Sequence, residues 1–258
     1  MAAATPICVS AQHPRAAATM SANIANALAS RPHSIVGIAA TDTALGVTCA
    51  LNPTAHFYSA SVIKVTILSA LLYKIGGVGN LTTAQRNLAS AMITQSSNTA
   101  ASTLWGEVGI AHMQTFLSRA GMTSTVLNSA WGLTKITPRD ELTQLRVLSY
   151  PSLLGPNARA YVLSLMAKVI ASQRWGVSAS APSNVTVHLK NGWLNYPASV
   201  DWNINSIGVF TGTNINYQIA VLNHPAAGGQ SESYGIQTVQ SVAGIINRNL
   251  AGLYALFG

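Results

Sequence analysis

The spacing of apolar residues predicts most of the secondary structure of the chain. Met20, Ile24 and Leu28 lie about one helical turn apart, as expected on the buried face of an amphipathic helix. The same reasoning, together with the turn residues between apolar runs, divides the first third into a helix over 16–30, strands over 34–40 and 45–51, and a second helix over 61–75. Glycines at 76 and 77 end the second helix.

The middle of the chain, residues 83–174, has helical spacing and no convincing strand. Prolines stand at the boundaries of its last segments, where proline is tolerated at a helix start or in a linker. The helices predicted here cover 84–94, 100–105, 110–120, 139–150 and 157–172. Afterwards the spacing predicts strands over 185–189, 202–210 and 217–223, and a closing helix over 233–253.

This order of elements requires the two ends of the chain to meet in one antiparallel sheet. We therefore predict an α+β fold with a five-stranded antiparallel sheet, flanked by helices in three α/β/α layers, and an inserted all-helical lobe. The predicted boundaries place residues 1–57 and 178–258 in the sheet lobe and 58–177 in the helical lobe. A catalytic cleft is expected between the two lobes.

Composition excludes several classes of protein. Of 258 residues 49% are hydrophobic and only 8% are charged, which excludes a disordered chain and is common in extracellular proteins. The net charge is +8, but the 14 Lys and Arg residues are scattered without a run of three, so we expect no nucleic-acid partner. The longest mostly apolar stretch, 65–73, is too short to span a membrane.

The two cysteines, Cys8 and Cys49, allow a single disulfide. No CxxC pair and no cluster of His, Cys and acidic residues has the spacing of metal ligands, so we expect neither a metal nor a cofactor. A disulfide that ties the N-terminal arm to a strand is one use for the pair, and two buried free thiols are the alternative. Residues 1–12 contain no apolar signal-peptide core, which favours a mature secreted or periplasmic protein without its leader. We expect it to be a monomer.

Ser61-Val62-Ile63-Lys64 is the first candidate for catalysis, at the start of a predicted helix. Three residues make about one turn, so the Lys64 amine can reach the Ser61 hydroxyl. Serine becomes a nucleophile when an adjacent base takes its proton, and lysine serves as that base when burial or a nearby cation keeps it neutral. Backbone N–H groups at the helix start favour a developing oxyanion. Taken alone, this motif fits a catalytic pair and an ordinary surface Ser and Lys on a helix equally well.

Two further polar motifs follow. Ser96-Ser97-Asn98 lies between two predicted helices, where Ser96 can relay a proton and Asn98 can hold Lys64 or a substrate carbonyl, although an ordinary polar turn is the simpler interpretation of a tripeptide. Lys190-Asn191-Gly192 ends the predicted strand 185–189. Its lysine places a cation near Lys64, and its glycine lets backbone pass close to a substrate.

S-x-x-K, S-D-N and K-T-G, in this order, are the signature of class A β-lactamases and penicillin-binding proteins. The chain carries each element in the expected context of helix start, helical-lobe turn and sheet strand, so it resembles this serine hydrolase superfamily, which includes DD-peptidases. The resemblance covers nearly the whole chain, with similar runs at 57–65, 91–101 and 137–148.

The resemblance implies an acyl-enzyme mechanism on a small-molecule or peptide substrate. Ser61 would attack the carbonyl, Lys64 would act as base, Ser96 would protonate the leaving nitrogen, Asn98 would orient and Lys190 would steer the substrate. The backbone N–H groups of Ser61 and Trp193 would form the oxyanion hole. The substrate would contact Asn191, Gly192 and Trp193.

Several departures from the family pattern bear on the substrate. Class A enzymes carry an Ω-loop glutamate that activates the deacylating water, but no acid lies between Gly121 and Pro138, where a shortened segment, 131–134, stands instead. Fast β-lactam hydrolysis is therefore not expected. Ser96 follows Ser61 by only 35 residues, which predicts a more open site.

The positions that would bind a substrate carboxylate are also altered. The strands at 202–210 and 217–223 lack Arg and Lys, which leaves only Lys190 and Arg174 for such a group and favours a less anionic or larger acyl donor. Asn191 stands where a hydroxyl residue is usual, and Ser97 where Asp is usual.

We therefore predict an acyl hydrolase or transferase. The alternative is a non-turnover relative that binds a β-lactam or cell-wall peptide as a sensor or sink. An unrelated basic binding module would require all three motifs to be coincidence.

Overall fold

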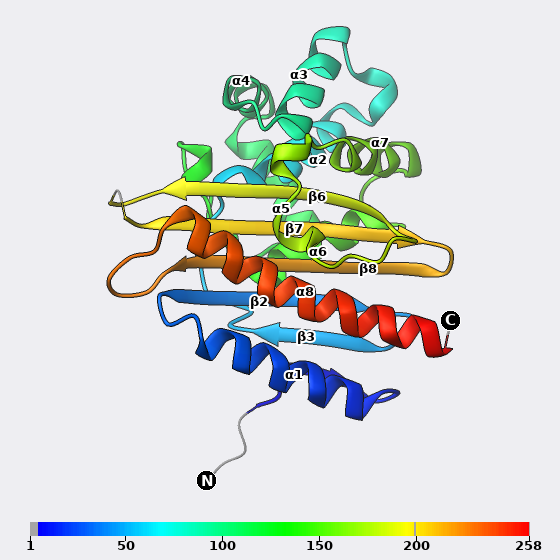
Figure 1. Ribbon diagram of the computed structural model, residues 1–258. Helices are drawn as coiled ribbons and strands as arrows, with labels where there is room; N and C mark the ends of the chain where they lie inside the picture. Colours follow the sequence, from blue (N-terminus) through cyan, green and yellow to red (C-terminus); the bar gives the residue numbers. More distant parts are fainter. Residues whose placement is uncertain (1–4, 199, 258) are drawn as a thin grey trace.

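A six-stranded antiparallel sheet forms the middle layer of the computed structural model, which describes residues 5–198 and 200–257 (Figure 1). Its strands lie in the order β1-β3-β2-β8-β7-β6. They are β1 (Cys8–Ser10), β2 (Ser34–Asp42), β3 (Val47–Leu51), β6 (Thr186–Asn195), β7 (Trp202–Gly212) and β8 (Ile215–Pro225). Pairing of β2 with β8, from Ser34 opposite Pro225 to Asp42 opposite Tyr217, brings the two ends of the chain together and confirms the predicted closure.

Helices cover both faces of this sheet (Figure 1). On one face lie α1 (Pro14–Ala29) and α8 (Glu232–Phe257), which contact each other and the strands. On the other face α6 (Pro138–Ser149) packs on β2, β7 and β8. Four of the remaining helices, α2 (Ile63–Ile75), α3 (Thr83–Thr94), α4 (Asn98–Val108) and α7 (Pro156–Ala167), gather beyond the β6 edge, and α5 (Ile110–Ala120) packs against α2, α4 and α6. The predicted α+β class and layered arrangement are therefore confirmed.

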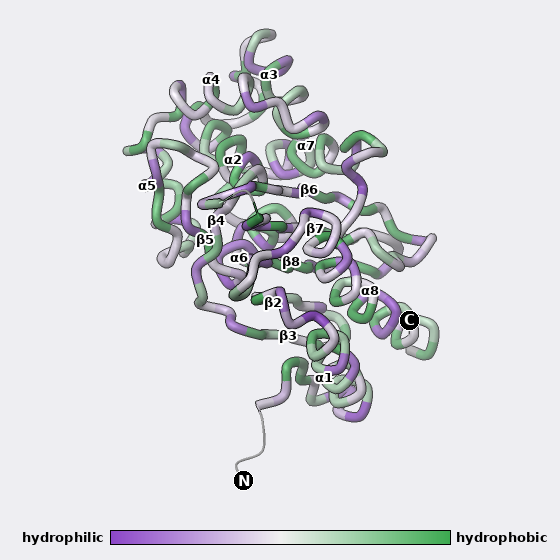
Figure 2. The backbone as a smooth tube through the Cα atoms, turned by 60° about the vertical axis from the view of Figure 1, so that its left-hand side comes forward, coloured by the Kyte–Doolittle hydropathy of each residue, from purple (hydrophilic) through white to green (hydrophobic). Residues whose placement is uncertain are grey.

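The side chains of the strands alternate between two hydrophobic cores, one on each face of the sheet. In β7, Ile207 and Val209 join the core under the helical block, whereas Ile204 and Phe210 join the core under α1 and α8. Successive side chains of a strand point to opposite faces, so a strand covered on both faces is apolar along most of its length. Hydrophobic and hydrophilic stretches alternate along α1 and α8, as expected of helices with one face on a core (Figure 2).

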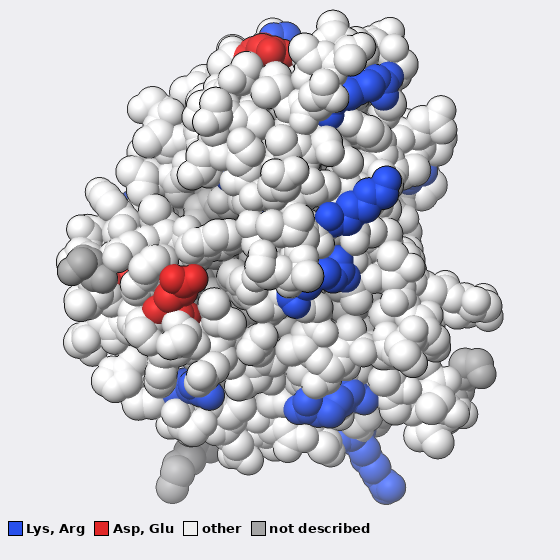
Figure 3. Space-filling model, turned by 45° about the horizontal axis from the view of Figure 1, so that its top comes forward, with Lys and Arg blue, Asp and Glu red and all other residues white. Residues whose placement is uncertain are grey.

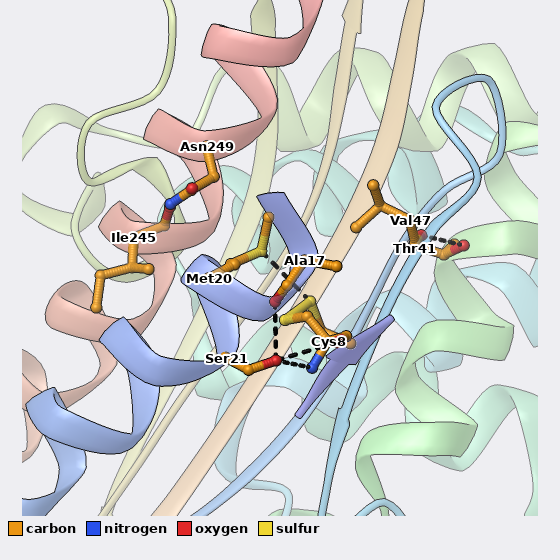
Figure 4. The surroundings of a disulfide bond; sticks show 9 residues. Cys8, Ala17, Met20, Ser21, Thr41, Val47, Ile245 and Asn249 are labelled. Atoms are coloured by element: carbon orange, nitrogen blue, oxygen red, sulfur yellow. Dashed lines mark hydrogen bonds between the residues drawn. A yellow bond between two sulfur atoms is a disulfide. The ribbon is translucent and has the colours of Figure 1, made fainter. Parts of the chain in front are cut away.

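The sheet has one strand more than the predicted five. The N-terminal arm does not merely cross β3 but pairs with it, in a register that places Cys8 opposite Cys49 and Ser10 opposite Val47. A disulfide joins Cys8 to Cys49, and Ser21 on α1 accepts a hydrogen bond from the Cys8 backbone N–H and donates one to its carbonyl (Figure 4). Three residues are too few to show a period, which is why sequence spacing missed this strand.

Two other predictions about strands were wrong. The segment 83–174 contains β5 (Lys135–Ile136), which pairs with β4 (Phe57–Tyr58) in a separate two-stranded sheet. In addition, β6 does not end before Lys190 but continues to Asn195, because β7 pairs with it along this whole length. Both differences arise from pairing with a distant segment, which local spacing does not reveal.

The surface carries few charges. On the face drawn in Figure 3, Lys and Arg side chains lie in several separate places and few acidic ones accompany them. No helix among the described residues is long and apolar enough to cross a membrane. Within 5–198 and 200–257, no group of three or more His, Cys, Asp or Glu residues is arranged to hold a metal ion.

Candidate active site

Ser61 lies where β4 passes into the helical lobe. The chain leaves β4 through Ser59, forms the short 3-10 helix η1 (Ala60–Val62) and continues directly into α2. Ala60 has φ of 46° and Ser96 has φ of 59°, a left-handed conformation that costs a residue with a Cβ roughly 1 kcal/mol or more. Such strain is typical of functional sites, and here it occurs at the residue before Ser61 and at Ser96 itself.

Lys64 is fully buried one turn after Ser61 and holds four polar contacts. Its Nζ lies 3.0 Å from Ser61 Oγ, 3.1 Å from Ser96 Oγ, 2.7 Å from the Ser96 carbonyl oxygen and 2.7 Å from Asn98 Oδ1. These partners are hydroxyl, carbonyl and amide groups, none of them a carboxylate. Burial without a compensating charge lowers the pKa of Lys64 from 10.5 to about 7.

The two shortest contacts determine what the neutral amine can do. The carbonyl oxygens of Ser96 and Asn98 accept hydrogen bonds but cannot donate them, so they take the two N–H groups of an uncharged Lys64. The remaining lone pair then faces the two hydroxyls, either of which can donate to it. The arrangement can thus accept the Ser61 proton without moving a side chain.

Ser96 connects this amine to a second lysine. Lys190, also fully buried, donates to Ser96 Oγ over 3.0 Å and to the Asn191 carbonyl over 2.8 Å. Burial, followed by the nearby charge of Lys64, holds the pKa of Lys190 well below its ordinary value. Because the two amines share one hydroxyl, a proton on either disfavours a proton on the other.

Local capping places the Ser96–Asn98 turn. α3 ends at Thr94 and α4 begins at Asn98, and the Ser97 hydroxyl accepts from the Ala100 backbone N–H at the start of α4. Asn98, the next residue, accepts from Lys64, and serine and aspartate are both good N-caps, so Ser97 can fill the position where the resemblance leads one to expect aspartate.

Gly192 allows β6 to lie against the start of η1. A Cβ built on Gly192 would come within 2.8 Å of the Ser61 backbone nitrogen, 2.9 Å of the Ser59 carbonyl oxygen and 3.0 Å of the Val62 nitrogen. Only glycine fits at this distance, so the backbone after Lys190 runs beside the Ser61 N–H. The close approach brings the β6 backbone beside the Ser61 N–H, the first member of the predicted oxyanion pair.

Two side chains from the predicted substrate site point elsewhere. Neighbours on a strand face opposite ways, so Asn191 faces away from Ser61, and its Nδ2 donates to the carbonyls of Gln173 and Trp175 over 2.7 Å and 3.0 Å. The Trp193 ring packs edge-on against Trp175, with centroids 5.9 Å apart. The structure therefore brings only the backbone of these two residues beside the candidate site.

Arg174, which was expected near a substrate carboxylate, and His188, which precedes Lys190 by two residues on β6, are both engaged in hydrogen bonds. Arg174 donates to the backbone carbonyls of Ala167 and Val187 over 2.9 Å and 3.2 Å. Both ring nitrogens of His188 are hydrogen-bonded, to the Leu163 carbonyl and to Thr211 Oγ1, each at 2.8 Å. These contacts fit a structural role for both side chains.

Asp140 and Glu141, the two acids after the shortened loop, lie in the first turn of α6, where the negative charge of Asp140 complements the helix dipole. Asp140 accepts hydrogen bonds from the Ser124 N–H and the Thr125 hydroxyl over 2.9 Å and 2.7 Å. Glu141 is fully buried with no hydrogen-bond partner for either oxygen among the described residues. Burial, and then the charge of Asp140, raise the pKa of Glu141 to about 8.

Sequence analysis did not predict that Asn205, Ser59 and Trp131 would contact or support the site. Asn205 on β7 donates to the carbonyls of Tyr58 and Ser59, and so holds the chain that leads into Ser61. Ser59 donates in turn to the carbonyl of Trp131, whose ring lies on Lys64, with Nζ 4.8 Å from the ring centroid. An unexpected Asn in a hydrophobic strand was the one available signal for Asn205. None existed for Ser59 or for the contact of Trp131.

The family model described as the Beta-lactamase enzyme family matches residues 73–250, about two thirds of the chain. This range includes Ser96, Asn98 and Lys190 but begins after Ser61 and Lys64. No curated protein matches the chain.

Solved structures with the same fold have low sequence identity to the chain. A class A beta-lactamase from Bacteroides cellulosilyticus is 17% identical, with a TM-score of 0.77 over 90% of this chain and 97% of the other. The protein PBP-A is 18% identical, with a TM-score of 0.77 over 91% of this chain and 96% of that chain. A PBP-A mutant, solved as an acyl-enzyme complex with penicillin G, is 17% identical, with a TM-score of 0.75 and coverage of 91% and 97%.

Proposed function

The chain belongs to the Beta-lactamase enzyme family, and on that premise we propose that it is an active-site serine acyl hydrolase or transferase that forms an acyl-enzyme at Ser61. The observation that carries this proposal is the continuous contact from Ser61 Oγ through Lys64 Nζ and Ser96 Oγ to Lys190 Nζ, with each step between 3.0 and 3.1 Å. A buried amine with a pKa near 7 beside a hydroxyl is a group suited to general-base catalysis.

In the acylation step, Ser61 Oγ bonds to the carbonyl carbon of a β-lactam or related amide or ester while Lys64 takes the hydroxyl proton. The backbone N–H groups of Ser61 and Trp193 stabilise the oxyanion, and each such donor is typically worth about 10²–10³ in rate. The C–N or C–O bond then breaks, and the proton passes through Ser96 Oγ to the leaving atom. Lys190 holds Ser96 in place and adds positive potential in its protonated form, and Asn98 orients Lys64.

In the second step the acyl group leaves Ser61, and the route open to it is restricted. Water or an amine must attack the ester carbon, lose a proton and return one to Ser61 Oγ. The partners of Lys64 include no carboxylate that would take the proton from water, so we expect this step to be slow with water. The acyl donor is a small molecule or peptide.

A second candidate function is favoured by the same lack of a carboxylate at Lys64. A protein that acylates and does not turn over would act as a penicillin-binding or cell-wall-peptide-binding sensor or sink. The Cys8–Cys49 disulfide and the low charge content support placement of either protein in a secreted or periplasmic compartment.

Intact-protein mass spectrometry after mixing with a penicillin, sampled from seconds to hours, tests these proposals. We expect an adduct on the wild-type protein and none on Ser61→Ala, with both proteins folded by circular dichroism. A persistent adduct favours the slow or non-turnover protein, and a short-lived adduct with accumulating hydrolysed drug identifies a working β-lactamase. A Ser61→Ala variant labelled at the wild-type rate would refute Ser61 as nucleophile.

A further inference from the structure

The shortened loop between α5 and α6 places an aromatic ring beside the candidate base. Trp131 begins the 3-10 helix η3 (Trp131–Leu133), and its ring centroid lies 4.8 Å from Lys64 Nζ. Trp131 is half-buried, and its Nε1 donates to Ser102 Oγ on α4 over 3.1 Å. The indole therefore bridges from the loop to the helical lobe across one side of Lys64.

The backbone of this loop is fixed to the strand that precedes the nucleophile. The single proton of Ser59 Oγ can be donated to the carbonyl of Trp131 or of Gly132, which lie 3.3 Å and 3.4 Å away, and the Ser59 N–H donates to the Thr134 carbonyl over 2.8 Å. Ser59 itself is fully buried. Because the loop is bonded at both ends of η3 and the ring is bonded at its nitrogen, the orientation of the indole is defined by several contacts.

An indole face, unlike a carboxylate, cannot activate a water molecule for hydrolysis by taking its proton. It stabilises a cation by its quadrupole, so it tolerates the ammonium that Lys64 becomes after taking the Ser61 proton. It has no lone pair that would take a proton from water, and its Nε1 is a donor only. The ring face itself carries no hydrogen-bonding lone pair that would hold a hydrolytic water on that side of Lys64.

From these contacts we infer that Trp131 determines the fate of the acyl-enzyme, by excluding water from the Lys64 side of the Ser61 ester so that the ester persists until an acceptor other than water reaches it. This inference rests on the proposed acylation of Ser61 and assigns Trp131 a positioning role, not a role as proton donor or acceptor. Hydrolysis forms the bond from water oxygen to the acyl carbon, breaks the bond to Ser61 Oγ and returns one water proton to Ser61. The indole slows this step by keeping water out.

Acyl-enzyme lifetimes in Trp131 variants test the inference. The wild-type protein, Trp131→Phe and Trp131→Ala are each acylated with a penicillin, freed of excess drug, and followed by intact-mass spectrometry with and without hydroxylamine as a small acceptor. Trp202→Ala is the matched control, because Trp202 is also half-buried but lies on β7. Thermal melts of all four proteins establish that they are folded.

We expect Trp131→Ala to lose its acyl group to water at least about tenfold faster than wild type, and Trp131→Phe to stay within about threefold. The ratio of loss to hydroxylamine over loss to water should fall in Trp131→Ala alone, since a general loosening of the fold would change both rates together. Equal lifetimes in Trp131→Ala and Trp202→Ala, with normal acylation in both, overturn the inference and leave the proposed function standing. Absence of a wild-type Ser61 adduct with a penicillin and with an activated ester refutes the proposed function, and the inference with it.

Discussion

Replacement of Gly192 by alanine tests whether the close approach of β6 to η1 serves acylation. The added methyl group would meet three backbone atoms, the Ser61 nitrogen at 2.8 Å, the Ser59 oxygen at 2.9 Å and the Val62 nitrogen at 3.0 Å. Each distance is several tenths of an ångström below ordinary van der Waals contact, and backbone atoms cannot rotate away as a side chain does. Either β6 or the start of η1 must therefore move.

Two costs follow from this movement. Overpacking of a buried site typically costs about 1–3 kcal/mol of stability. In addition, displacement of the Ser61 N–H removes an oxyanion donor, which typically costs about 10²–10³ in rate. We expect Gly192→Ala to remain folded, with a lower melting temperature, and to acylate about a hundredfold more slowly than wild type.

Gly208→Ala is the matched control for this experiment. A Cβ on Gly208 would lie 2.9 Å from Val177 Cγ2 and 3.0 Å from the His188 carbonyl oxygen, so it strains the same sheet away from Ser61. The rate of adduct formation with a penicillin, measured by intact-mass spectrometry, should fall only in Gly192→Ala. A folded Gly192→Ala protein that acylates within about threefold of wild type would show that this glycine serves packing and not the oxyanion.

Three further predictions concern titration and the disulfide. Acylation requires neutral Lys64, so the acylation rate should rise with pH through a midpoint near 7. An acylation rate that does not change with pH, in stopped-flow or mass measurements, would contradict this prediction. The Lys64→Ala variant should acylate about 10³-fold more slowly or worse. Because Glu141 has a folded pKa of about 8 against an ordinary 4.5, its proton is favoured in the folded state, so stability should fall as pH rises from about 4.5 to 8, by up to roughly 5 kcal/mol; urea melts of Glu141→Gln should lack this fall, and stability curves of the two proteins that run parallel with pH would contradict it. Reduction of Cys8–Cys49, which are 41 residues apart, should destabilise the fold by about 4 kcal/mol in the chain-entropy estimate, and unchanged melts of a Cys49→Ser variant refute that figure.

Sequence patterns identified the elements in which apolar residues recur several times with helical or strand spacing. α5 begins and ends where helical spacing placed it, and α1, α2, β2, β7 and β8 agree to within a few residues. An amphipathic helix or a buried strand repeats the same apolar signal several times, so one misleading residue does not hide it. The Ser61–Lys64 contact belongs to the same category, because a helical turn fixes the distance between residues three apart.

Short elements gave no such signal. β1, β4 and β5 contain three or two residues each, and they exist because a distant strand offers backbone hydrogen bonds. The extension of β6 through Lys190 has the same origin in its pairing with β7. It reverses the expected orientation of Asn191, since the neighbour of a cleft-facing residue on a strand must face away.

The sequence alone therefore determined the class of fold and identified the three motifs to which the proposed chemistry is assigned. Tertiary structure decided how these motifs meet. Ser96 contacts the amines of both Lys64 and Lys190, which are 32 and 94 residues away from it in the sequence. The Trp131 ring, which lies on Lys64, comes from a loop without a periodic pattern. The pKa values of Lys64 and Glu141 likewise depend on burial by many segments. Local spacing encodes what neighbours along the chain can do, whereas desolvation and close approach are properties of residues that only folding brings together.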